Sequence, residues 1–142
     1  MTGNIFTSTA PAVGHGVNCQ GVMGSGIAVQ FRTLFPEMFR QYKALCNASL
    51  LVPGEVFPFQ TENFLVYNIA SQRLPGANAT LEWLEEGLHA VLSDAEDRGY
   101  DRVALPQIGC GIGGLDIADV RPLIISVEAG SSMEFEFWTY QG

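Results

Sequence analysis

The chain has 142 residues, of which 47% are apolar and 15% are charged, and its formal net charge is −8. A domain commonly has this length, so we expect residues 1–142 to fold as a single unit. The apolar content excludes wholesale disorder. The acidic balance argues against a basic surface for nucleic acid or for a membrane.

The cysteines and the first residues bear on where the protein works. Cys19, Cys46 and Cys110 are far apart and form no Cys-x-x-Cys or Cys/His cluster, so neither a disulfide framework nor a zinc site is indicated. No Lys or Arg precedes Arg32, so the start lacks the basic region of a signal peptide, and polar residues interrupt any membrane span. We expect a cytoplasmic monomer without cofactor or metal ion.

Short apolar runs alternate with segments whose apolar residues fall at helical spacing. In chain order, the predicted elements are strand 12–18, helices 25–35 and 37–46, strands 55–60 and 64–70, helix 80–98, strand 102–106, helix 116–129 and strand 134–140. This order predicts an α/β fold with a largely parallel sheet and helices on both faces. In such sheets, ligands bind beyond the carboxyl ends of the strands.

Residues 18–26 (NCQGVMGSG) form a first glycine-rich segment between a predicted strand and a predicted helix. Glycines allow a backbone to approach a ligand closely, and a helix start adds free N–H donors and a positive dipole end. A phosphate site is therefore one interpretation. The other, given equal weight, is a tight turn that needs glycine for its geometry alone. The segment matches neither the Rossmann glycine pattern nor a P-loop.

Residues 106–115 (PQIGCGIGGL) form a second glycine-rich segment in the same strand-to-helix context. Both segments should lie at the same edge of a parallel sheet. Two such segments together could hold a ligand with two phosphates between two sugars.

Four other residues have competing interpretations. His15 is either a buried, hydrogen-bonded histidine near a strand end, which the residues alone favour, or a general acid/base. Cys19 and Cys110 are interpreted as small buried thiols rather than as nucleophiles. Trp138 either packs in the core or offers a stacking face to a base.

Four stretches of the sequence, in order, resemble macro domains: GNIF (3–6), HGVNCQGVMGSGIAVQF (15–31), FPE (35–37) and LPQIGCGIGGLD (105–116). The similarity extends from Gly3 to Tyr140. It is greatest to a branch that contains terminal ADP-ribose protein glycohydrolases, antitoxins that reverse DNA ADP-ribosylation, and yeast-type ADP-ribose 1″-phosphate phosphatases. The resemblance implies a three-layer α/β/α fold with a mixed, largely parallel central sheet, and ADP-ribose or a derivative as ligand.

The resemblance also implies roles for individual residues. Residues 21–26 would hold the distal ribose and phosphate, residues 109–114 would wrap the diphosphate, and Trp138 would lie beside the adenine. His15 matches a histidine of the phosphatase branch and so becomes the leading catalytic candidate. Asp116 either assists it or caps the following helix. The ligand-binding residues expected from the resemblance are Asn4, Ile5, Asn18, Gln20, Gly21, Met23, Gly24, Ser25, Gly26, Ile27, Ser71, Ile108, Gly109, Cys110, Gly111, Ile112, Gly113, Gly114 and Trp138.

Three positions depart from the family pattern. Ser71 stands where glycohydrolases of this branch have a lysine, Gly113 stands where they have an acid, and Asn4 replaces an aspartate that commonly recognises adenine. Lysine-dependent removal of ADP-ribose from glutamate or from DNA is therefore not expected by the usual route. The leading hypothesis is a hydrolase of a terminal-ribose phosphate or ester that uses His15. The alternatives are a non-catalytic module for ADP-ribose-like or cyclic ADP-ribose nucleotides and an unrelated nucleotide-binding α/β domain.

Overall fold

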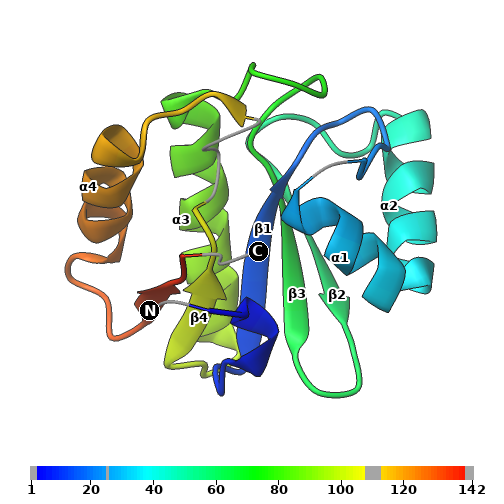
Figure 1. Ribbon diagram of the computed structural model, residues 1–142. Coiled ribbons are helices and arrows are strands. Elements are labelled where there is room, and N and C mark those ends of the chain that lie inside the picture. Colours follow the sequence, from blue (N-terminus) through cyan, green and yellow to red (C-terminus); the bar gives the residue numbers. More distant parts are fainter. Residues whose placement is uncertain (1–2, 25, 108–112, 140–142) are drawn as a thin grey trace.

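The computed structural model describes residues 3–24, 26–107 and 113–139, which form a five-stranded sheet (Figure 1). The strands are β1 (Ala12–Val17), β2 (Val56–Gln60), β3 (Leu65–Ala70), β4 (Arg102–Leu105) and β5 (Glu134–Phe137). Their spatial order is β2-β3-β1-β4-β5. The pairs β1–β3, β1–β4 and β4–β5 are parallel, and β2–β3 is antiparallel. The prediction of a mixed, largely parallel sheet is confirmed.

Helices cover both faces of this sheet. The described residues form α1 (Ile27–Leu34), α2 (Pro36–Asn47), α3 (Leu81–Asp97), α4 (Ile117–Glu128) and a short 3₁₀ turn, η1 (Ile5–Thr7). Figure 1 shows α1 and α2 on one side of the sheet and α3 and α4 on the other, which confirms the three-layer architecture. The predicted bounds agree with the structure within two residues, except that β5 ends three residues earlier and η1 was not predicted.

The central strands are buried on both faces, and their side chains divide between two cores. Along β1, Ala12 packs in the core under α3 and α4, whereas Val13 and Val17 pack in the core under α1 and α2. All six residues of β3 are buried, which explains why this segment is an almost continuous apolar run. β2 is antiparallel because residues 61–64, which join it to β3, are too few for a crossover.

The parallel strands β1, β3, β4 and β5 end at the same edge of the sheet, which we call the carboxyl edge. Its described residues are 18–24, 71–80, 106–107, 113–115 and 138–139. Both glycine-rich segments leave from this edge, as predicted. Glu55 lies near it too, since its carbonyl accepts a hydrogen bond from the amide of Ala70 (2.9 Å).

Candidate functional site

Asn18 organises the first glycine-rich segment directly after β1. Its side-chain Oδ1 accepts hydrogen bonds from the amides of Gln20 (3.0 Å) and Val22 (3.4 Å), and its Nδ2 donates to the carbonyl of Val22 (2.8 Å). One asparagine side chain thus closes the turn of the loop on itself. Both polar atoms of the Asn18 side chain form hydrogen bonds within the loop. The contribution of this side chain to a ligand site is therefore to hold the loop backbone in shape.

The Tyr42 side chain of α2 is hydrogen-bonded to this turn. Its hydroxyl lies 2.8 Å from the carbonyl oxygen and 2.9 Å from Oδ1 of Asn18, and it donates to this pair of acceptors. Burial raises the pKa of Tyr42, so the hydroxyl keeps its proton. Tyr42 falls in the predicted helix 37–46, and no local sequence pattern connects it with Asn18, which is 24 positions away.

Positive backbone angles explain two glycines of the first segment. Gly21 has a φ of 78°, and a Cβ atom there would lie 3.1 Å from Cγ of Lys43. Gly26 has a φ of 62° and precedes α1 without a side-chain cap, while the first turn of α1 has no acidic residue. The amides at the start of α1 therefore have no capping side chain, and they suit an anionic acceptor.

Residues 71–80, which follow β3, connect the two glycine-rich segments. The amide of Cys19 donates to the carbonyl of Arg73 (3.0 Å), and the amide of Ala79 donates to the carbonyl of Gly113 (3.1 Å). Figure 1 shows this segment in green beyond the end of the sheet. Of this segment only Ser71 was predicted as a site residue, whereas Arg73 and Ala79 are the residues that connect it to the two glycine-rich segments.

The side chains of Gln72 and Asn78 make residues 71–80 rigid. Gln72 Nε2 donates to the carbonyls of Leu74 (2.7 Å) and Gly76 (2.8 Å). Asn78 Oδ1 accepts from the amide of Leu74 (2.9 Å), and its Nδ2 donates to the carbonyl of the same residue (2.6 Å). The segment therefore keeps its shape without regular secondary structure.

The end of the second glycine-rich segment packs closely against residues 71–80. At Gly114, φ is 83°, and an added Cβ would lie 2.9 Å from Cβ of Ala77. At Gly113, an added Cβ would lie 3.1 Å from Oε1 of Gln72 and 3.2 Å from Cβ of Ala79. Glycine is needed here for close approach as well as for φ.

His15 lies in the middle of β1 and is fully buried. Its Nε2 is 2.6 Å from Oδ1 of Asn68, while Asn68 Nδ2 donates to the carbonyl of Phe57 (3.0 Å). This arrangement assigns the proton to Nε2 of His15, because the facing amide oxygen can only accept. The ring stacks on Phe31 with centroids 3.8 Å apart.

The electrostatics of His15 favour a neutral ring. Burial lowers the pKa of His15 to about 4, against a smaller opposite effect of the Asn68 hydrogen bond. Nδ1 has no hydrogen-bond partner among the described residues. These features match the first interpretation of this residue, a buried and hydrogen-bonded histidine, and its acid/base role stays a prediction.

Asp116 caps α4, since its Oδ1 accepts from the amide of Ala118 (2.9 Å). This geometry matches the capping interpretation. Its assistance to catalysis stays a prediction.

Asn4, Ile5 and Trp138 come together where the two ends of the chain meet. The amide of Gly3 donates to the carbonyl of Thr139 (3.0 Å), which brings Asn4 beside the end of β5. Asn4 Oδ1 accepts from the amide of Phe6 (2.9 Å) and caps η1. Ile5 and Trp138 are both buried, in the core under α1 and α2. Whether Trp138 also lies beside an adenine stays a prediction.

The other expected ligand residues divide by exposure. Met23 and Ser71 are buried, Ile27 is half-buried, and Gln20 and Gly24 are exposed. Ser25, Ile108, Gly109, Cys110, Gly111 and Ile112 lie outside the described residues.

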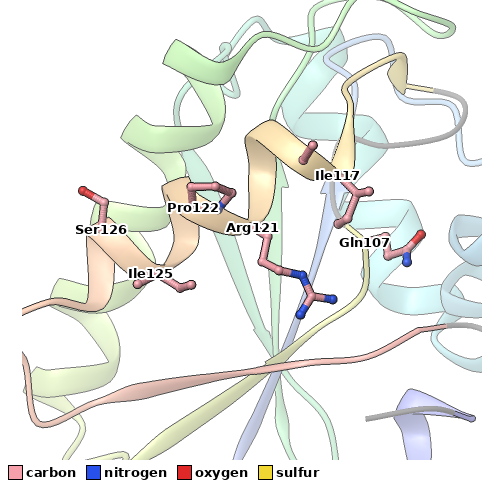
Figure 2. A pocket seen from close by; sticks show the side chains of 7 residues that line it. Gln107, Ile117, Arg121, Pro122, Ile125 and Ser126 are labelled. Carbon is pink, nitrogen blue, oxygen red and sulfur yellow. The ribbon is translucent and has the colours of Figure 1, made fainter.

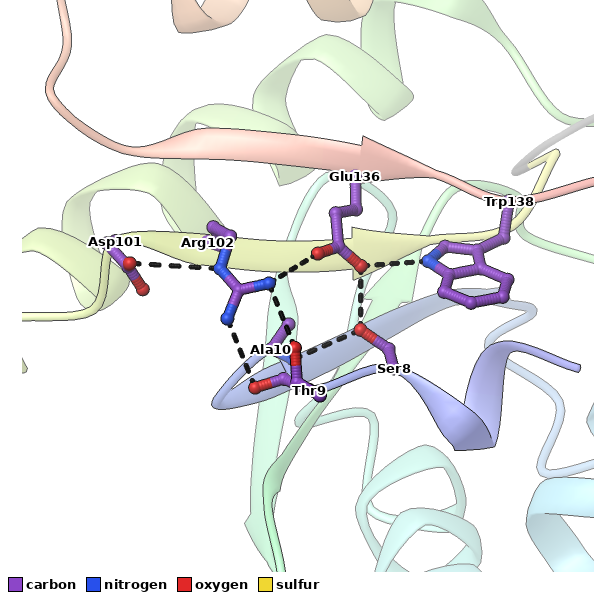
Figure 3. Close-up of polar contacts among 7 residues, drawn as sticks. All are labelled: Ser8, Thr9, Ala10, Asp101, Arg102, Glu136 and Trp138. Carbon is purple, nitrogen blue, oxygen red and sulfur yellow. Dashed lines mark hydrogen bonds and ion pairs between the residues drawn. The ribbon is translucent and has the colours of Figure 1, made fainter. Parts of the chain in front are cut away.

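A hydrogen-bonded network around Arg102 lies on the neighbouring strands β4 and β5 (Figure 3). Glu136 Oε2 accepts from Nη1 of Arg102 (2.7 Å), and its Oε1 accepts from Ser8 Oγ (2.6 Å) and Trp138 Nε1 (2.9 Å). Arg102 also donates to the side-chain and backbone oxygens of Thr9, both at 3.2 Å. We call these residues, with Asp101, the Arg102 network. It fixes the indole of Trp138 and leaves the carboxylate of Glu136 fully engaged.

A pocket of about 600 Å³ lies beside α4 and is lined in part by Gln107, which follows β4 (Figure 2). Gln107 and Arg121 lie at one end of it, and Ile125 and Ser126 lie at the other. The guanidinium of Arg121 stands 4.8 Å from the ring centroid of Phe137. The volume is in the range of small-molecule sites.

Within residues 3–24, 26–107 and 113–139, no helix is long and apolar enough to cross a bilayer. In the same ranges, no three His, Cys, Asp or Glu side chains gather in an arrangement that could hold a metal ion.

The sequence matches the family profile of the Macro domain over residues 15–124. The chain belongs to the macro domain family. The resemblance found in the sequence is thereby confirmed, and the hypothesis of an unrelated α/β domain is excluded.

Curated relatives of this macro domain carry several names. A DNA ADP-ribosyl glycohydrolase of Mycobacterium tuberculosis is 31% identical over 88% of this chain. The match spans 37% of that relative, so the chain corresponds to well under half of it. Human ADP-ribose glycohydrolase OARD1 is 27% identical over 82% of this chain and 74% of its own length. An ADP-ribose 1″-phosphate phosphatase of Aspergillus clavatus is 29% identical, over 89% of this chain and 69% of its own.

Solved structures agree with the family assignment. The macrodomain of Mycobacterium tuberculosis DarG superimposes with a TM-score of 0.88 at 27% identity, over 97% of both chains. The macrodomain of Thermus aquaticus DarG gives a TM-score of 0.84 at 27% identity, over 100% of this chain and 99% of that one.

Proposed function

We propose that this macro domain binds ADP-ribose or a derivative of it at the carboxyl edge. The observation that carries the proposal is the connection of the two glycine-rich segments through residues 71–80, by the hydrogen bonds from Cys19 to Arg73 and from Ala79 to Gly113. The names of the curated relatives above all refer to ADP-ribose or to ADP-ribosyl groups.

The charge distribution supports an anionic ligand despite the net charge of −8. Residues 18–26, 71–80 and 106–115 contain no Asp or Glu. Backbone amides and a helix N-terminus can bind phosphates without a cationic cluster.

We propose hydrolysis of a phosphate or ester on the terminal ribose as the activity of this site. Backbone donors of the two segments would stabilise the negative charge that develops on the reacting oxygens. His15 is the candidate acid/base residue, and Asp116 is a candidate assistant. The phosphatase name of one relative supports this choice.

The second candidate is a module that binds or sequesters the nucleotide without chemistry. Full burial of His15 and the capping role of Asp116 favour it, because they leave both catalytic candidates engaged in the fold. Cyclic ADP-ribose nucleotides are further candidate ligands for such a module.

Calorimetric titration with ADP-ribose, with AMP and NAD in the same buffer, tests the binding. Micromolar or tighter affinity for ADP-ribose, well above that for AMP and NAD, is expected. Preference for AMP or NAD would contradict the proposal.

Phosphate release from ADP-ribose 1″-phosphate under multiple-turnover conditions then separates the two candidates. In the hydrolase hypothesis, His15→Ala abolishes turnover and retains binding, whereas His89→Ala, which alters an exposed histidine, changes neither. Binding by the wild type with no product from any terminal-ribose substrate would favour the module.

A further inference from the structure

Arg73 stands out as the single charged residue of the three segments that leave β1, β3 and β4. Residues 18–26, 71–80 and 106–115 otherwise contain only uncharged side chains. We propose that the guanidinium of Arg73 binds a phosphate carried by the terminal ribose of the nucleotide, and so makes the site selective for the phosphorylated form. This inference rests on the proposed function of the carboxyl edge.

The backbone of Arg73 is held firmly although its side chain is exposed. Its carbonyl accepts from the amide of Cys19, at the beginning of the first glycine-rich segment. On both sides of it, the Gln72 and Asn78 side chains fix the loop through hydrogen bonds to Leu74. A cation on a rigid support loses less conformational freedom on binding than one on a loose loop.

The guanidinium of Arg73 makes no ion pair within the described ranges, unlike three other arginines. Arg40 pairs with Glu37, Arg98 pairs with Asp94, and Arg102 pairs with Glu136. The remaining two described arginines, Arg32 and Arg121, stand over aromatic rings of Phe39 and Phe137. A planar guanidinium free of carboxylates matches the geometry of a phosphate.

Two charged residues, Glu55 and Lys43, lie near this part of the carboxyl edge. Burial raises the pKa of the Cys19 thiol most and Cys46 raises it further, while Arg73 lowers it and Glu55 raises it by a smaller amount. The Glu55 carboxylate already accepts from the amide of Val52 (3.0 Å). Lys43 belongs to α2, and its alkyl stem packs against Gly21.

The position of Arg73 indicates which end of the nucleotide it meets. The backbone carbonyl of Arg73 contacts the first glycine-rich segment, and its guanidinium is near enough to the Cys19 thiol of that segment to lower the pKa of the thiol. By the resemblance, this segment would hold the distal ribose. An anionic group on that ribose is therefore the ligand group that Arg73 would reach. A phosphate monoester is the group that we infer.

The test compares binding of ADP-ribose and ADP-ribose 1″-phosphate by calorimetry for the wild type, Arg73→Gln and Arg73→Lys. We expect Arg73→Gln to weaken binding of the phosphorylated nucleotide about 10-fold to 100-fold, the range for a lost charge-assisted hydrogen bond, and to change ADP-ribose binding less than about 3-fold. Arg73→Lys should recover part of the difference, because the charge is kept and the bidentate geometry is lost.

Arg32→Gln is the matched control, since it removes an exposed arginine of α1 that stands over Phe39. Equal loss in Arg32→Gln would indicate a general effect of net charge and would overturn the inference. Equal weakening of both ligands by Arg73→Gln would also overturn it.

Two further outcomes separate the inference from the proposed function. If the wild type binds ADP-ribose and Arg73→Gln leaves the phosphorylated form unaffected, the inference fails and the proposed function stands. If the wild type binds neither nucleotide, the proposed function fails and the inference fails with it. An ADP-ribosylated oligonucleotide serves as a third ligand, and an Arg73 effect confined to it would overturn the assignment to a ribose phosphate.

Discussion

Arg102 and Arg73 show two ways in which this fold uses an arginine. The guanidinium of Arg102 is surrounded by the carboxylate of Glu136 and the oxygens of Thr9, so its charge is compensated inside the protein (Figure 3). Arg73 has an equally well-held backbone and no carboxylate partner in the described residues. The contrast teaches that a cation neutralised within the fold contributes to stability, whereas a cation with no carboxylate partner in the described residues is available to an anionic ligand.

Glu136 shows how completely the Arg102 network is satisfied. Burial alone would raise the pKa of Glu136, but hydrogen bonds from Ser8, Trp138 and Arg102 outweigh burial and lower it. Its side chain is 13% exposed, so solvent competes little with these partners. Changes in this network should therefore act mainly on the stability of the fold, and they reach the nucleotide site only through the indole of Trp138.

The largest expected effect is that of Glu136→Ala. It leaves the indole N–H of Trp138 and the Ser8 hydroxyl without their acceptor, and it leaves Arg102 with only the more distant Asp101 (3.7 Å) as an ion-pair partner. We expect a loss of about 3 kcal/mol in the free energy of unfolding, measured by urea denaturation, and a change in ADP-ribose affinity below about 3-fold, since only the indole of Trp138 connects this network to the site. Glu134→Ala, on an exposed residue of the same strand, is the control and should cost less than about 0.5 kcal/mol. A loss of affinity without a loss of stability in Glu136→Ala would reverse the comparison.

The second effect is at the carboxyl edge. Asn18→Ala removes the side chain that closes the first glycine-rich turn and leaves the buried Tyr42 hydroxyl with the Asn18 carbonyl as its remaining close acceptor. We expect a loss of about 2 kcal/mol in stability together with at least a 10-fold loss of ADP-ribose affinity. Asn63→Ala, an exposed asparagine in the β2–β3 hairpin, should leave both quantities unchanged. Normal affinity in the Asn18→Ala variant would mean that this turn does not shape the site.

The third and smallest effect concerns the two histidines, which repeat the contrast between an engaged and an exposed group. In the folded chain the pKa of His15 is lowered to about 4 from its ordinary value of 6.5. On acidification, the unfolded chain therefore binds a proton at this histidine at a higher pH than the folded chain does. The stability due to this neutral histidine is present above pH 6.5 and falls as the pH drops toward 4. Between pH 7 and pH 5.5 this contributes about 1 kcal/mol of destabilisation.

Unfolding free energies of the wild type, His15→Gln and His89→Gln at pH 7 and pH 5.5 check this. His15→Gln should lose that part of the pH dependence, while His89→Gln, on an exposed helix position, should keep it. Identical pH profiles for the wild type and His15→Gln would show that the imidazole is not held neutral by burial.

The sequence predicted the architecture and the edge that carries the site, because both follow from local patterns. Periodicity located the strands and helices, and the four-residue link between β2 and β3 accounts for the antiparallel pair. The η1 turn escaped because three residues are too few to show a period. Gly21, Gly26 and Gly114 belong to the two glycine-rich segments that the sequence pointed to, and all three have positive φ angles in the structure.

The rest of the candidate site depends on contacts between residues far apart in the chain. The Tyr42–Asn18 hydrogen bonds and the Cys19–Arg73 link join different elements, so no window of sequence contains both partners. For the same reason the sequence left open whether His15 is buried and whether Asp116 is a cap. Arg73 was visible in the sequence, but its isolation from carboxylates is a property of the folded chain.

The most direct test of the account is a ¹H–¹⁵N NMR titration of the ¹⁵N-labelled chain with ADP-ribose. We predict saturable shifts of the amides of residues 18–24, 71–80 and 113–114, and little change at Thr9, Asp101 and Arg102. Shifts concentrated at Ser8, Thr9, Asp101, Arg102 and Glu136, or around the pocket beside α4, with the carboxyl edge unchanged, would contradict the claim that the nucleotide binds where the parallel strands end.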